Sequence, residues 1–118
     1  MENKKAIKLI KKILDDLDHA GIVYNTLANQ LKELRVFAVE EELPVVAKAL
    51  RLAYEHLEEF EIFVAPIPED EGFEEDETER ITGSESMIYF INLIKNQNNP
   101  LNVEELREYI SYLEDFAD

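Results

Sequence analysis

The chain has 118 residues, 46% of them hydrophobic, and its 27 acidic against 12 basic residues give a net charge of −15. This length suits a single domain with its own core, and the hydrophobic fraction argues against intrinsic disorder. The negative charge argues against direct binding to nucleic acid or to an anionic membrane, and the lack of cysteine excludes disulfides, thiolate metal sites and cysteine nucleophiles.

The chain contains 3 glycines and 4 prolines, so we expect a few long elements, which favours helices. The most regular stretch covers residues 6–38. Apolar residues recur there in steps of four and three, which is typical of a helix face packed against other helices. These residues are Ala6, Ile10, Ile13, Leu17, Ala20, Tyr24, Leu27, Leu31, Leu34 and Ala38.

Gly21 decides whether this stretch is one helix or two. Gly21 between Leu17 and Ile22 fits a Schellman stop, whereas the unbroken spacing allows a single helix, since one internal glycine costs only about 1 kcal/mol. Charge favours a hairpin, because a turn would bring Lys4, Lys5 and Lys8 near Glu33 and residues 40–42.

Later turn and cap signals divide the rest of the chain. Pro44 predicts the start of a third helix that fades near Val64, with Val46, Leu50, Ala53, Leu57 and Phe60 on one face. Ser84 is expected to cap a fourth helix that runs through Gln97, and its residues 87–94 are apolar nearly all round. Asn102 with Glu105 resembles a capping box at the start of the last helix, whose apolar face carries Val103, Leu106, Ile110, Leu113 and Ala117, flanked by Tyr109 and Phe116.

The pattern therefore predicts an all-α fold, an antiparallel bundle of four to five helices with one long acidic loop. Residues 1–118 form one domain, with a three-helix part at 1–65, the acidic loop at 66–83 and a helical hairpin at 84–118. The two helical parts share one core, because residues 87–94 are too apolar for a two-helix unit. The alternative is an α+β fold with a short strand pair at residues 60–64 and 87–91.

The acidic loop is the strongest candidate site. It would dock a basic partner, with Ile67, Phe73 and Ile81 as apolar anchors among carboxylates. A solvated linker is the plainer alternative, and a calcium site is disfavoured because the loop lacks the residue order of an EF-hand. The predicted partner-binding residues are Glu69, Asp70, Glu71, Phe73, Glu74, Glu75, Asp76, Glu77 and Glu79.

Carboxylates also line several expected helix faces, where rows at i,i+4 spacing could imitate the phosphates of a nucleic acid. Ordinary solvated faces, partly paired with lysine and arginine, are the favoured interpretation. The carboxylates on these helix faces are those of Glu33, Glu40, Glu41, Glu42, Glu55, Glu58, Glu59, Glu104, Glu105 and Glu108.

Catalytic chemistry finds no support in the motifs. A di-iron bundle needs two Glu-x-x-His pairs, but His19 follows Asp16 by three residues and His56 follows Ala53. We interpret His19 as a helix C-terminal cap and His56 as a histidine at the edge of the core. No catalytic, cofactor-binding or metal-binding residue is predicted.

The sequence thus predicts a non-enzymatic, cytoplasmic protein without a membrane span, because its first lysines lead into an amphipathic pattern. The expected function is a protein–protein interaction or regulatory module that docks a partner through a helix face or the acidic loop, with a homodimer as one form of that docking. The first alternative is an inhibitor that mimics nucleic-acid charge, and the second is a small enzyme of unknown type.

Overall fold

The computed structural model describes residues 1–68 and 80–117, which contain five helices. The helices are α1 (Lys4–Ala20), α2 (Tyr24–Glu40), α3 (Pro44–Phe60), α4 (Gly83–Lys95) and α5 (Pro100–Ala117). The predicted all-α bundle is confirmed. The alternative with strands is wrong, since residues 87–91 lie inside α4 and no strand occurs in the described residues.

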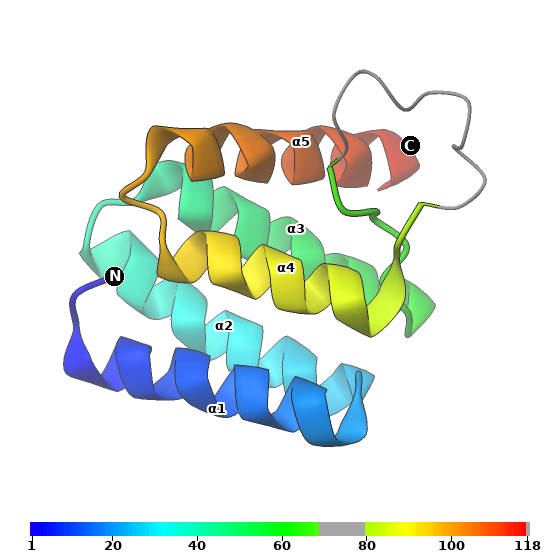
Figure 1. The fold of residues 1–118 in the computed structure, drawn as a ribbon, viewed down its shortest axis with the longest axis horizontal. Coiled ribbons are helices and arrows are strands. Elements are labelled where there is room, and N and C mark those ends of the chain that lie inside the picture. Colours follow the sequence, from blue (N-terminus) through cyan, green and yellow to red (C-terminus); the bar gives the residue numbers. More distant parts are fainter. Residues whose placement is uncertain (69–79, 118) are drawn as a thin grey trace.

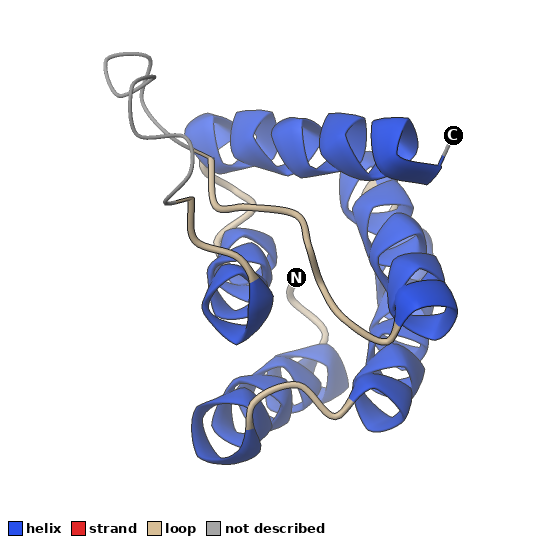
Figure 2. Cartoon of the chain, turned by 90° about the vertical axis from the view of Figure 1, so that its right-hand side faces the viewer, coloured by secondary structure: helices blue, strands red, loops and turns tan. Residues whose placement is uncertain are grey.

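The five helices close into a ring. Successive helices alternate in direction (Figure 1), and the main contacts join α1 to α2, α2 to α3, α3 to α5, α5 to α4 and α4 back to α1. Helix α5 crosses the others obliquely, and residues 61–68 pass over one end of the ring (Figure 2). Phe63 and Ala65 of this segment are buried, so it covers the core at that end.

The hairpin at Gly21 is confirmed, since α1 and α2 are separate helices. Gly21 has φ 70° and its N–H donates to the Leu17 carbonyl at 3.0 Å, and glycine reaches such a positive φ without steric cost. Its ψ of −156° lies outside the left-handed helical region, so the cap is not the predicted Schellman stop. The apolar residues predicted to form one face within residues 6–38 are buried except Ala20 and Tyr24, which border the turn.

The expected charge pairing between these two helices is wrong. Within the described residues, Lys4, Lys5 and Lys8 form no ion pair. The carboxylate that reaches α1 is Glu41, which accepts hydrogen bonds from the backbone N–H groups of Glu2 and Asn3 at 3.0 Å each. These bonds lower the pKa of Glu41 and fix the start of α1 to the end of α2.

Helix α3 begins at Pro44 as predicted, because proline suits the first turn, where its missing N–H costs nothing. The helix ends at Phe60, four residues before the predicted end. Glu61 adopts a left-handed conformation there (φ 65°, ψ 8°), and its N–H bonds to the Leu57 carbonyl.

Three predicted boundaries of α4 and α5 are wrong. Helix α4 starts at Gly83, so Ser84 lies inside its first turn, and the helix ends at Lys95 instead of Gln97. Helix α5 starts at Pro100, before Asn102. Asn99 acts as its cap by accepting the N–H of Leu101 at 2.9 Å, because the proline that follows it already holds a helical φ.

Helix α4 is the most enclosed helix of the ring, as its apolar composition predicted. Met87, Phe90, Ile91 and Ile94 are each completely buried. Contacts with α1 on one side and α5 on the other supply the cover that an apolar helix needs.

Ile91→Asp should therefore lower the free energy of unfolding by several kcal/mol, roughly 3–5, because it buries an unpaired charge. Chemical denaturation measures the effect. Leu101→Asp is the control, since Leu101 is 73% exposed and should tolerate the change. Equal stability of the two variants would contradict the buried position of Ile91.

Candidate functional site

The nine predicted partner-binding residues, Glu69 to Glu79 in the list above, lie outside the described residues. The structure does describe the two flanks of this acidic segment, residues 66–68 and 80–82. The flanks lie side by side, since the Ile67 N–H donates to the Ile81 carbonyl at 2.9 Å and the Gly83 N–H donates to the Phe63 carbonyl at 3.0 Å. Of the three predicted anchors, Ile67 and Ile81 are thereby brought together, and Phe73 falls outside.

A buried hydroxyl network holds the first flank against the bundle. Ser86 on α4 donates its hydroxyl to the Ala65 carbonyl at 2.7 Å and contacts the Tyr109 hydroxyl of α5 at 2.8 Å. Tyr109 also donates to the Ser86 carbonyl at 3.1 Å, and burial raises its pKa far above the usual range. Tyr109 therefore stays a neutral donor that ties three parts of the chain together.

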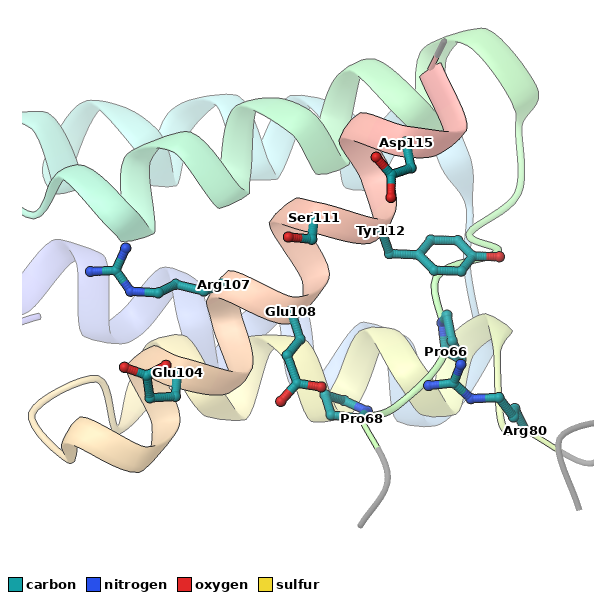
Figure 3. Close-up of a pocket in the computed structure, with 9 residues that line it drawn as sticks. All are labelled: Pro66, Pro68, Arg80, Glu104, Arg107, Glu108, Ser111, Tyr112 and Asp115. Carbon is teal, nitrogen blue, oxygen red and sulfur yellow. The ribbon is translucent and has the colours of Figure 1, made fainter. Parts of the chain in front are cut away.

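A groove of about 460 Å³ runs between these flanks and α5 (Figure 3). Glu108 extends from α5 toward Pro68 of the first flank, and Arg80 extends from the second flank. The lining residues are Pro66, Pro68 and Arg80 from the flanks and Glu104, Arg107, Glu108, Ser111, Tyr112 and Asp115 from α5. We call this the α5 groove.

The charged groups that line the α5 groove are three carboxylates, Glu104, Glu108 and Asp115, and the guanidinium groups of Arg80 and Arg107. The pKa of Glu108 is raised, first by burial and then by the charges of Glu105 and Glu104, and Arg80 only partly offsets these effects. Burial disfavours a charge of either sign, so the preference of the groove for a positively charged group rests on its excess of carboxylates over guanidinium groups.

An aromatic cluster of His56, Phe60, Tyr112 and Phe116 adjoins the groove, with Tyr112 belonging to both. Ring centroids are 5.0 Å apart for Phe60–Phe116, 5.1 Å for His56–Phe116 and 6.4 Å for Tyr112–Phe116. Phe60, Tyr112 and Phe116 are 37%, 37% and 42% exposed, so they present a joint apolar face to solvent. Sequence reasoning missed this cluster because Phe60 lies on the predicted apolar face of α3 and Phe116 flanks that of α5. Their positions in the last turns of α3 and α5 were the available signal, since a helix end offers less neighbouring structure to cover them.

Both histidines occupy the places expected of them. His56 is buried, and its Nε2 accepts the Val64 N–H at 3.3 Å. Burial lowers its pKa, although the charge of Glu59 opposes this. His19 lies at the end of α1, where its Nδ1 is 2.7 Å from the Asp15 carbonyl and its pKa is raised by that bond.

Several carboxylates of the expected helix faces have structural partners. Glu55 pairs with Arg51, Glu58 pairs with Lys32, and Glu105 accepts the Tyr89 hydroxyl. Within residues 1–68 and 80–117, no group of three or more histidine or acidic side chains could hold a metal ion. None of the described helices is long and apolar enough to cross a membrane.

No family model matches the chain, and no curated protein or solved structure is significantly similar to it. The function must therefore be argued from the chain's own residues. What the fold and site define is an all-α bundle with a carboxylate-lined groove beside an exposed aromatic cluster.

The buried His56 should make stability depend on pH. Its folded pKa is below the unfolded value of about 6.5, so the unfolded chain binds the extra proton first as the pH falls. The free energy of unfolding should drop below pH 6.5, by at most about 1.4 kcal/mol per pH unit from this group.

Urea unfolding at pH values between 7.5 and 5.5 should show that the free energy of unfolding depends less on pH in His56→Gln than in the wild type. His19→Gln is the matched control, and it should make the loss of stability at low pH steeper. The reason is that the raised pKa of His19 stabilises the fold at low pH, a contribution that is lost as the pH rises. An unchanged slope in His56→Gln would contradict the assignment.

Proposed function

We propose that this chain is a non-enzymatic, cytoplasmic interaction protein that docks a basic partner protein through the α5 groove and the aromatic cluster. The observation that carries this proposal is the exposure of Phe60, Tyr112 and Phe116 beside a groove lined by Glu104, Glu108 and Asp115. Adjacent exposed aromatic side chains mark interaction surfaces, and carboxylates beside them select a cationic partner.

Arginine is the partner side chain that this surface suits best. A guanidinium can lie over the face of Tyr112 or Phe116 and at the same time bond a carboxylate in a bidentate manner. Lysine would supply the charge without the planar geometry. The site therefore favours a segment that presents arginine next to apolar residues.

The acidic segment would act on the rate of encounter. Eight of the eleven residues from 69 to 79 are acidic, and both flanks of this segment border the α5 groove. A dense negative charge at the rim of a site attracts a basic partner over a distance and accelerates association, most strongly at low salt. The segment would thus raise the association rate, whereas the aromatic cluster would slow dissociation.

An inhibitor that mimics nucleic-acid charge is the second candidate. The like-charge effect of Glu104 and Glu105 on the pKa of Glu108 favours it, since it indicates closely spaced carboxylates on α5. Arg80 and Arg107 line the same groove, however, and interrupt the row of negative charge. The mixed charges and the exposed aromatic rings fit a protein segment better than they fit a surface built to receive phosphates.

A pull-down from the native cell lysate, eluted with a salt gradient, tests the proposal. The double variant Tyr112→Ser, Phe116→Ser should weaken capture of the partner at least about tenfold, since aromatic side chains carry much of the binding energy at such surfaces. The variant with Glu74, Glu75, Asp76 and Glu77 changed to serine should slow association and reduce its salt dependence.

Leu101→Ser is the matched control, because it removes an exposed apolar side chain from the opposite end of α5. A partner retained by the Tyr112→Ser, Phe116→Ser variant and released by modest salt would favour the charge mimic. If no partner is captured, light scattering should reveal self-association; a monomer that captures no partner contradicts the proposal.

A further inference from the structure

The first half of α1 carries a dense group of lysines. Five of the 12 basic residues fall within the first twelve positions, at Lys4, Lys5, Lys8, Lys11 and Lys12. Among the described residues, Lys12 alone of these forms an ion pair, with Asp16 on the same helix at 3.4 Å. A chain with a net charge of −15 thus leaves four lysines of one helix without a carboxylate partner in the described structure.

These lysines also act against their own helix. They occupy the first half of α1, where the helix dipole disfavours positive charge, and Lys4, Lys8 and Lys12 follow each other at i,i+4, where like charges repel. Such local conflicts are expected at functional positions. An anionic partner on this face would relieve both of them.

An apolar groove lies beside the lysines, between α1 and the end of α4. It has a volume of about 370 Å³, and Lys11 and Lys95 border it, with Asp15 farther along α1. Its remaining lining residues are Met1, Ile7, Ile10 and Leu14. Ile7 is 50% exposed, so the groove presents apolar surface to solvent between positive charges. We call it the α1 groove.

We propose that the α1 groove binds an acidic amphipathic helix of a second partner protein. Apolar side chains of that helix would enter between Ile7 and Leu14, and its carboxylates would meet Lys11 and Lys95. Helical spacing places Lys4 and Lys8 on the stripe next to Ile7, within reach of further carboxylates. This surface is separate from the α5 groove, since no residue lines both grooves and α1 and α5 lie on opposite sides of the bundle (Figure 1).

Shape and charge favour a protein helix over other anionic partners. A bilayer cannot follow a concave groove between two helices, and duplex DNA offers no apolar side chains to fill it. Both are also extended polyanions that the net charge of −15 repels at long range, whereas a short helix brings only a few charges to one place.

The test uses the full chain and a panel of labelled helical peptides of about 18 residues, with leucine, isoleucine or phenylalanine on one face and glutamate on the other. Fluorescence anisotropy at low salt measures binding, and amide chemical shifts locate it. We expect at least one peptide to bind and to shift the signals of Ile7, Lys11 and Leu14. A peptide of the same composition with a shuffled order should bind at least about tenfold more weakly.

Four variants make the test specific. Ile7→Ser and the pair Lys11→Gln, Lys95→Gln should each weaken the peptide about tenfold. Lys12→Gln is the matched control, since Lys12 neighbours Lys11 but does not line the groove, and it should leave the affinity unchanged. The Tyr112→Ser, Phe116→Ser variant should also bind normally, which separates this inference from the proposed function.

Several outcomes would overturn the inference. They are no binding by any peptide of the panel, equal binding of the shuffled peptide, or equal loss in Lys12→Gln. Tighter binding to phosphatidylserine vesicles or to a duplex DNA oligonucleotide than to every peptide would assign the lysines to a membrane or a nucleic acid instead.

Discussion

The position of the α5 groove depends on one buried contact, that of the Ser86 hydroxyl with the Ala65 carbonyl and the Tyr109 hydroxyl. Ser86 is fully buried and Tyr109 is 1% exposed, so neither hydroxyl has water as an alternative partner. The network fixes residue 65 next to α4 and α5. Pro66, which begins the flank of the acidic segment, is thereby placed against α5, and the α5 groove is formed at the same time.

The ring of helices explains why both charged surfaces lie at its margins. Apolar side chains of all five helices fill the interior, and the described ion pairs lie between exposed side chains. Exposed pairs of this kind contribute little to stability, so burial has to hold the fold together. The surface charge is then free to be distributed unevenly, with lysines at the start of α1 and carboxylates along α5 and the acidic segment.

The sequence predicted the helices better than it predicted the site. Apolar spacing located the buried faces, and Gly21 and Pro44 marked two turns correctly because their backbone preferences act locally. The predicted caps at Ser84 and Asn102 were wrong because α4 begins one residue before Ser84, at Gly83, without a side-chain cap, and because Asn99 caps α5 ahead of Pro100. The aromatic cluster was missed, since apolar spacing does not show that Phe60 and Phe116 lie at helix ends that little else covers.

The two proposed surfaces are joined by a packed core, and this favours a bridging role. Coupling between distant sites requires an element with two arrangements of similar free energy. Helix α4 packs against both α1 and α5, where Phe90, Ile91 and Leu106 are completely buried, and close packing of this kind resists such rearrangement. Occupation of one surface would therefore leave the other intact. Under the two proposals, the bundle would hold a basic and an acidic partner at a fixed separation, which is the behaviour of an adaptor and not of a switch.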